Sequence, residues 1–142
     1  FSAGFTSYGS ANPLPVQYEP GVTNVNFMCS KFDNDWTNAM KLSGEPENVF
    51  LKDFINILAL AHTIIAEKKN GILTYNASSP DELALTNAAR HFGFTFADRD
   101  EDSNMIIHDK FSNKDKKYEL LNVIEFTSAR KRMSIIVRTP EN

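Results

Sequence analysis

Two groups of residues have the types and spacing that a ligand site needs. The first is Ser79-Pro80-Asp81-Glu82, in which an acid follows a serine by three positions. This spacing is typical of a capping box, where the serine oxygen accepts from the Glu82 N–H and the carboxylate returns to the Ser79 N–H. The same carboxylate, turned away from its own helix, could instead accept a hydrogen bond from a ligand amine. The pattern alone leaves both roles open.

The second group surrounds Phe126, where a predicted strand runs into a basic turn that contains Arg130-Lys131-Arg132. An aromatic ring for a base and cations for phosphates are what nucleotide binding requires. A last core residue followed by a solvated basic hairpin turn would have the same sequence. The spacing therefore indicates a nucleotide site without deciding it.

Motifs for other chemistries are missing from the sequence. It has no G-x-x-x-x-G-K-[ST] or G-x-G-x-x-G phosphate loop and no G-x-S-x-G nucleophile. His62, His91 and His108 do not have metal-ligand spacing, and Cys29 is the only cysteine, so neither a metal site nor an internal disulfide is expected. The net charge of −3 argues against a general nucleic-acid binder.

Hydrophobic periodicity predicts the elements that position these groups. Helices are expected over residues 31–42, from Pro46 to a stop at residues 68–71, and from Ser79 to Gly93 with its buried face formed by Leu85, Ala88, Ala89 and Phe92. Strands are expected over residues 72–75, 94–97, 104–109, 117–126 and 133–139. Simple alternation places Tyr118, Leu120, Ile124 and Phe126 on one face of their strand. Together these elements predict an α+β fold, an antiparallel β-sheet flanked by helices.

Length and composition suit a single domain. The 142 residues are 42% hydrophobic and 23% charged, which is ordinary for a globular protein. Residues 1–21 mix Gly, Ser and Pro without a period and are predicted to be an irregular segment, followed by the domain over residues 22–142. The longest apolar stretch, residues 55–66, is shorter than the about 20 residues that span a bilayer. We interpret the chain as a domain of a longer protein.

Three stretches carry a family resemblance. The sequences YNASSPDE at residues 75–82 and YELLNVIEF at residues 118–126, the latter continued by RKRMSIIVRTPE, closely resemble the cytosolic nucleotide-binding domain of type IV P-type ATPases, the phospholipid flippases. LALAHT at residues 58–63 resembles a helical stretch of that domain. The S-P-D-E form separates lipid flippases from cation pumps. The resemblance implies the P-type ATPase N-domain fold, here truncated at its C-terminal side, so that residues 22–142 form a partial nucleotide-binding domain.

The resemblance also implies the site residues. Phe126 looks like the aromatic ring that stacks on adenine, and Glu82 looks like the acid near the exocyclic amine. Lys131 matches a basic residue of the pocket, with Ser128 and Met133 as wall residues. The Lys-Gly-Ala strand and a downstream arginine that complete the pocket in the family are not in this sequence. A further departure is the leucine that follows S-P-D-E, where the family usually has a small residue.

The function implied by the resemblance is an ATP-binding cytosolic domain of a phospholipid-translocating P-type ATPase, which presents the triphosphate to a separate phosphorylation domain. The whole enzyme would use ATP and Mg²⁺, with the metal ligands elsewhere, since the Asp-Lys-Thr-Gly-Thr motif is missing and no catalytic residue is expected here. The implied partners are the phosphorylation, actuator and transmembrane domains of the same polypeptide and an accessory subunit. Nucleic acid is not among them. The soluble domain would lie on the cytosolic side of a membrane.

A second function stays open. The stretch from Arg130 to Arg138 carries four cations and no acid. A non-catalytic interaction module could use this basic strand to bind an acidic protein or an anionic lipid.

Overall fold

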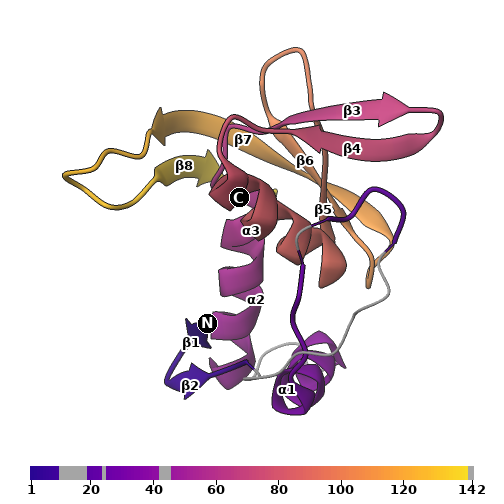
Figure 1. Ribbon diagram of the computed structural model, residues 1–142, viewed down its shortest axis with the longest axis vertical. Coiled ribbons are helices and arrows are strands. Elements are labelled where there is room, and N and C mark those ends of the chain that lie inside the picture. The colour runs from indigo at the N-terminus through magenta and orange to yellow at the C-terminus, as the bar shows by residue number, and fades with distance from the viewer. Residues whose placement is uncertain (10–18, 24, 42–45, 141–142) are drawn as a thin grey trace.

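A computed structural model describes residues 1–9, 19–23, 25–41 and 46–140 (Figure 1). The elements within these residues are β1 (Ser2–Ala3), β2 (Thr6–Ser7), α1 (Ser30–Lys41), α2 (Pro46–Leu60), β3 (Ile65–Lys69), β4 (Ile72–Asn76), α3 (Pro80–His91), β5 (Phe94–Arg99), β6 (Met105–Asp109), β7 (Lys114–Ile124) and β8 (Ser134–Arg138). Strands β1 and β2 form one hairpin and β3 and β4 another, while β5-β6-β7-β8 form an antiparallel meander. The predicted α+β class is confirmed.

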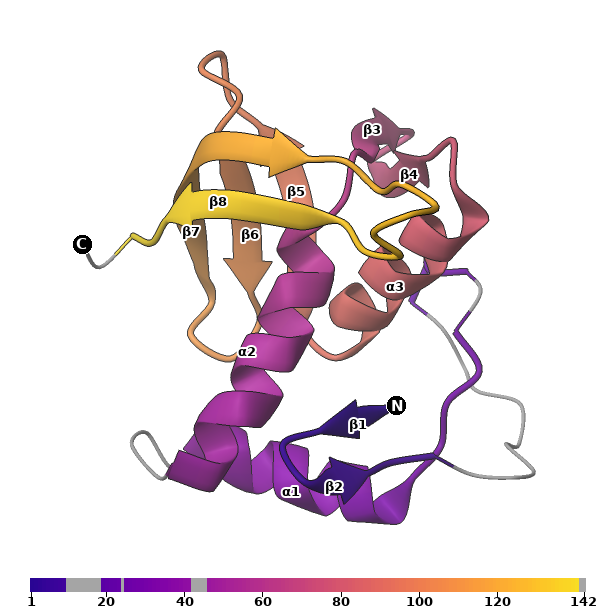
Figure 2. The same ribbon diagram turned by 90° about the vertical axis from the view of Figure 1, so that its left-hand side faces the viewer.

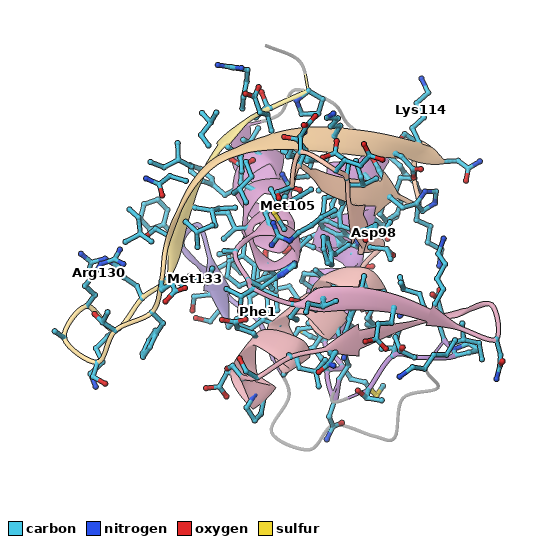
Figure 3. All side chains as sticks on the ribbon, turned by 90° about the horizontal axis from the view of Figure 1, so that it is seen from above. Phe1, Asp98, Met105, Lys114, Arg130 and Met133 are labelled. Carbon is cyan, nitrogen blue, oxygen red and sulfur yellow. The ribbon has the colours of Figure 1, made fainter. Side chains whose placement is uncertain are left out.

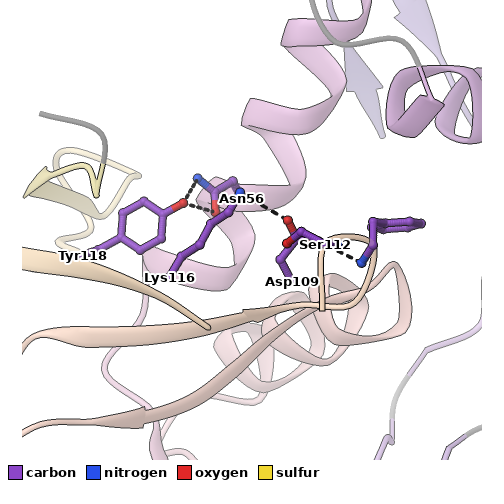
Figure 4. A network of polar contacts seen from close by, with 6 residues as sticks. Asn56, Asp109, Ser112, Lys116 and Tyr118 are labelled. Carbon is purple, nitrogen blue, oxygen red and sulfur yellow. Dashed lines mark hydrogen bonds and ion pairs between the residues drawn. The ribbon is translucent and has the colours of Figure 1, made fainter. Parts of the chain in front are cut away.

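The core lies where α2 and α3 pack against the meander (Figure 2). Ile55 of α2, Ala89 of α3 and Ile107 of β6 are each completely buried. A polar contact fixes α2 over the sheet, because the Asn56 amide donates to the Tyr118 hydroxyl of β7 at 3.1 Å (Figure 4). Helix α1 extends this core with an aromatic cluster, formed by Phe32, Trp36, Phe92 and Phe94.

Helix α3 begins and ends as its sequence predicts. The Ser79 hydroxyl oxygen accepts from the Glu82 N–H at 3.3 Å, and Pro80 occupies the first turn, where a missing N–H costs nothing. Gly93 follows the helix with a φ of +101°, a conformation that favours glycine. The predicted helix over residues 31–42 is also confirmed by α1, although residue 42 lies outside the described part of the chain.

The predicted continuation of the Pro46 helix to residue 69 is wrong. Helix α2 ends at Leu60, and residues 65–69 are instead the first strand of the β3–β4 hairpin. Asn70 and Gly71, interpreted from the sequence as a helix stop, have φ values of +53° and +80°. Two left-handed residues make a two-residue hairpin turn, for which Asn-Gly is the preferred sequence. At the end of the helix the His62 ring satisfies the carbonyl of Ala59, at a nitrogen-to-oxygen distance of 2.9 Å.

The buried face predicted for α3 is wrong in part. Ala89 and Phe92 are buried, but Leu85 is 49% exposed. The helix instead buries the polar side chains of Asn87 and Arg90, because the segment that precedes α1 crosses this face. The Arg90 guanidinium donates to the Leu73 carbonyl at 2.8 Å and to the Pro20 carbonyl at 3.0 Å, joining α3 to β4 and to that segment.

A β-bulge in β7 overturns the simple alternation predicted for that strand. The register against β8 shifts between Leu120 and Asn122, so Leu120 lies opposite Val137 and Val123 lies opposite Ile135. Val137 and Ile135 both pack against the core. One extra residue in β7 therefore moves Val123 to the inner face, and Ile124 takes the outer one.

Residues 1–9, part of the segment predicted to be irregular, include the β1–β2 hairpin. Ser2 pairs with Ser7, and the Phe1 ring stacks on Phe54 of α2 with centroids 4.7 Å apart. Tyr8 is buried, and its hydroxyl donates to Asp35 of α1 at 2.9 Å. Apolar rings that dock on the core thus order a segment that has no period of its own. Residues 10–18 of the predicted segment lie outside the described residues.

Candidate functional site

Phe126 lies just beyond the end of β7, at the start of the loop that leads to β8 (Figure 2). Its side chain is 57% exposed, and within the described residues its ring has no aromatic partner. A last core residue would be covered by its neighbours. The structure therefore excludes that interpretation of Phe126 and leaves an aromatic face that contributes little to folding.

The Arg130 side chain connects the two ends of this loop by hydrogen bonds. Its guanidinium donates from Nη1 to the carbonyls of Ile124 and Glu125, at 3.3 Å and 3.1 Å, and from Nη2 to the Ser134 hydroxyl at 2.9 Å. These bonds join Ile124, the last residue of β7, and the following Glu125 to Ser134, the first residue of β8. Arg130 is thus a structural clamp, and the sequence pattern that grouped it with phosphate-binding cations missed this role.

Lys131 occupies a tight turn in the same loop. Its backbone N–H donates to the Thr127 carbonyl at 2.8 Å, and its φ is +56°, which is uncommon for a residue other than glycine. Its side chain is exposed and, among the described residues, has no ion-pair partner. Ser128 is also exposed, and Met133 is half-buried at the base of the loop. Figure 3 shows Arg130 and Met133 on this projecting loop.

Glu82 projects from the first turn of α3. The capping box is only half formed, because Ser79 accepts from the Glu82 N–H while the Glu82 carboxylate turns to another residue. Its Oε2 atom accepts from the Thr63 backbone N–H at 3.0 Å and from the Thr63 hydroxyl at 2.9 Å. Both bonds use one oxygen. Oε1 has no partner among the described residues and is available to another donor.

The five predicted site residues come from two elements. Phe126, Ser128, Lys131 and Met133 share the β7–β8 loop, whereas Glu82 belongs to α3. Figures 1 and 2 show the loop and the first turn of α3 on the same side of the molecule. Within the described residues, no hydrogen bond joins Glu82 to the loop. Thr63 has no motif in the sequence that marks it as a site residue, although it ends the LALAHT stretch that carries part of the resemblance.

A family model described as "P-type ATPase, cytoplasmic domain N" matches residues 50–142. These residues include both predicted groups, the S-P-D-E turn and the Phe126 loop. The chain belongs to this family. The expected fold of an N domain is therefore the observed one, and the predicted resemblance to the P-type ATPases is confirmed.

Named relatives place this N domain close to one branch of the P-type ATPases. It is 46% identical over 99 residues, 70% of the chain, to phospholipid-transporting ATPase IC of Xenopus tropicalis. It is 41% identical over 142 residues, 96% of the chain, to phospholipid-transporting ATPase ID of Mus musculus. The fission yeast Schizosaccharomyces pombe has a relative, phospholipid-transporting ATPase dnf2, that is 37% identical over 119 residues, 84% of the chain. The chain spans only about a tenth of the length of these relatives, 8% to 11%.

Two features are absent from the described part of the N domain. No helix within the described residues is long and apolar enough to cross a membrane. Across the same residues, no three His, Cys, Asp or Glu side chains gather into a group that could hold a metal ion.

We expect Arg130→Met to loosen the N-domain loop while leaving the fold intact. The substitution removes three charged hydrogen bonds between the two ends of the loop, each of which contributes on the order of 1 kcal/mol. Amides of residues 126–133 should then gain fast motion in ¹⁵N relaxation measurements. Arg132→Met is the matched control, because Arg132 makes a single bond to the Arg130 carbonyl. Equal loosening in both variants would contradict the clamp.

Proposed function

We propose that this N domain holds ATP for a phospholipid-translocating P-type ATPase, with adenine stacked on Phe126. The exposure of the Phe126 ring is the observation that carries the proposal. Burying a large aromatic face is favourable, and leaving one in water at a strand end is explained if a planar ligand covers it. The Arg130 clamp supports this role, since it holds the loop that presents the ring.

Polar groups around the ring suit the remainder of the nucleotide. Glu82 has a carboxylate oxygen, Oε1, that can accept from the exocyclic amine of adenine. Lys131 places an exposed cation in the same loop as the ring, where it can attract the phosphates. Ser128 and Met133 would form walls of the site. The five residues together supply a stacking face, an acceptor and a cation.

The expected affinity is low. Stacking contributes about 0.5–1.5 kcal/mol beyond the burial of area, and each of a few polar contacts adds on the order of 1 kcal/mol. After the cost of association is subtracted, binding on the order of millimolar remains. A weak grip suits a domain that must release ADP in every cycle.

The chemical step belongs elsewhere in the enzyme. Phosphoryl transfer needs a nucleophile placed in line and Mg²⁺ ligands. Asp109, which is followed by a lysine as the phosphorylated aspartate of the missing motif would be, has a structural role instead. Its carboxylate accepts from the N–H groups of Phe111 and Ser112 at 2.9 Å and 3.3 Å and pairs with Lys116 at 3.2 Å (Figure 4). We therefore propose that the bound triphosphate projects to a separate phosphorylation domain, which would supply the aspartate and the Mg²⁺ site.

We extend the proposal to the whole enzyme from the names of the relatives. The parent protein would be an ATP hydrolase that moves phospholipid, with actuator and transmembrane domains in the same polypeptide and an accessory subunit. The N domain would lie on the cytosolic face of the membrane.

The alternative function, binding of an acidic protein or anionic lipid by the basic strand, has less support. Arg130 is committed to the loop, and Arg138 pairs with Glu119 of β7. Two of the four cations are thus already engaged, and Arg132 makes one bond to the Arg130 carbonyl, so among the described residues Lys131 alone has a side chain with no partner.

An NMR titration separates the two functions. If the proposal is correct, ATP and adenosine at millimolar concentrations will each shift the amides of residues 126–133 and of the first turn of α3, and inorganic phosphate will not. Adenosine is the decisive ligand because it has the base but no charge. Equal shifts with phosphate would favour the alternative, and no shift with ATP at 10 mM (on the order of ten times the expected dissociation constant) would overturn the proposal.

A further inference from the structure

Thr63 holds the carboxylate that is proposed to recognise adenine. Its backbone N–H and its hydroxyl both donate to Glu82 Oε2, at 3.0 Å and 2.9 Å. Two hydrogen bonds to one carboxylate oxygen restrict the rotamers that the Glu82 side chain can adopt. The contact also removes Glu82 from its capping role, since the carboxylate cannot return to the Ser79 N–H while it is held by Thr63.

The backbone that carries Thr63 is itself fixed. The buried ring of His62 accepts from the Ile64 N–H at 3.2 Å and donates to the Ala59 carbonyl at 2.9 Å. The His62 carbonyl in turn accepts from the Arg99 guanidinium of β5 at 3.2 Å. The residues on both sides of Thr63 are therefore tied to the core, so the N–H of Thr63 points in a set direction.

The helix that carries Glu82 also helps to orient its carboxylate. Glu82 leaves the first turn of α3, whose start is set by the Ser79 cap at 3.3 Å. Two segments that lie 19 residues apart in sequence thus meet at one oxygen atom and leave the other, Oε1, directed elsewhere.

We propose that Thr63 is a positioning residue for nucleotide selection, which fixes Glu82 so that Oε1 reads the base. The inference rests on the proposed function and adds a specificity-determining role to it. An ionised carboxylate only accepts hydrogen bonds. A purine with a 6-amino group offers a donor to a fixed acceptor, whereas a 6-oxo purine places a second acceptor against it.

The test compares ATP with ITP, which differ at this position of the base. Thr63→Val keeps the shape of the side chain and removes the hydroxyl donor, while the backbone donor remains. The ratio of ITP to ATP dissociation constants, measured by NMR titration of the Phe126 loop, should fall about fivefold, the factor expected for one hydrogen bond. Most of the change should come from weaker ATP binding. Thr63→Ser, which restores the hydroxyl, should keep the wild-type ratio.

Two controls make the result specific. Thr74→Val is the matched substitution, because the Thr74 hydroxyl also makes one hydrogen bond, to the Glu67 carbonyl at 3.2 Å, but lies in the β3–β4 hairpin. It should leave the ratio unchanged. In a Glu82→Ala background the ratio is expected to be low already, and adding Thr63→Val should change it no further, since the group that Thr63 positions is gone. A further fall in the ratio of ITP to ATP dissociation constants, when Thr63→Val is added to Glu82→Ala, would show that Thr63 acts independently of Glu82 and would overturn the inference.

The remaining outcomes separate this inference from the proposed function. If ATP shifts the Phe126 loop and Glu82→Ala lowers the ratio but Thr63→Val does not, Thr63 has no positioning role and the proposed function stands. A wild-type chain that binds ATP and ITP equally also overturns the inference alone. If neither nucleotide shifts the loop, the proposed function itself fails.

Discussion

Replacement of Phe126 by alanine is expected to abolish the ATP-induced chemical-shift changes in the β7–β8 loop. The ring is 57% exposed and has no aromatic partner in the described part of the chain, so its removal should cost the fold little. The same removal takes away the only aromatic face in the proposed site. Because the expected affinity is on the order of millimolar, the loss of about 0.5–1.5 kcal/mol of stacking and of the buried ring area moves binding beyond the range of a titration.

Phe5→Ala is the matched control for this experiment. Phe5 is fully exposed in the turn between β1 and β2, a hairpin that lies beside the lower part of α2, well below the β7–β8 loop (Figure 1). The Phe5→Ala variant should bind ATP as the wild type does. A Phe126→Ala variant with wild-type shifts would remove the ring from the site, and an unfolded variant, recognised by its collapsed amide dispersion, would show that Phe126 supports the core after all.

Acid is expected to destabilise the chain through His62. Burial, with a smaller effect from the nearby Arg99 guanidinium, lowers the pKa of His62 from 6.5 to about 4, although the Ala59 carbonyl and Glu82 oppose the shift. The unfolded chain therefore takes up this proton near pH 6.5 and the folded chain only near pH 4. The contribution of neutral His62 to the free energy of unfolding is fully present above pH 6.5. It is lost as the pH falls to 4, by about 3 kcal/mol in all at 1.36 kcal/mol for each pKa unit.

The hydrogen bonds of the His62 ring also predict that acid destabilises the fold. The Ile64 N–H already points at Nδ1, so a proton added there would set one donor against another. Urea denaturation between pH 7 and pH 4.5 measures the effect, and His62→Gln should flatten the slope, since glutamine takes up no proton. His91, whose pKa burial also lowers, should supply the smaller slope that remains. Parallel pH profiles for the wild type and His62→Gln would contradict the assignment.

His62 and Phe126 belong to the two parts of the proposed site. His62 precedes Thr63, which holds Glu82, and Phe126 begins the loop that projects on the same side as α3 (Figure 2). We expect acid to weaken ATP binding before it unfolds the chain, because protonation of His62 would loosen the segment that carries Thr63. The acceptor would then lose its fixed direction.

Several features could be predicted from short stretches of the sequence. The Ser79 cap and Pro80 determine where α3 begins, and this start puts Glu82 in its first turn. The four strands of the meander were predicted close to their observed positions in the chain because each has its own apolar pattern. The S-P-D-E turn and the Phe126 loop were also enough to indicate the family.

The errors arose where a local signal had two meanings. Asn70-Gly71 ends a helix as readily as it turns a hairpin, and only the pairing of β3 with β4 decides between them. The bulge after Leu120 depends on β8, 14 or more residues away, whose core-facing residues set the register. Arg130 resembled a ligand cation because a basic triplet does not record which carbonyls lie within reach of it.

The sequence by itself determined which residues could bind a nucleotide and which elements carry them, since residue type, capping and periodicity act over a few positions of the chain. Only the tertiary structure decided that Phe126 faces water, that Arg130 clamps its loop and that Glu82 is held by Thr63. Burial and hydrogen bonding between distant segments depend on packing that every element shapes at once, and no short stretch of sequence contains that information.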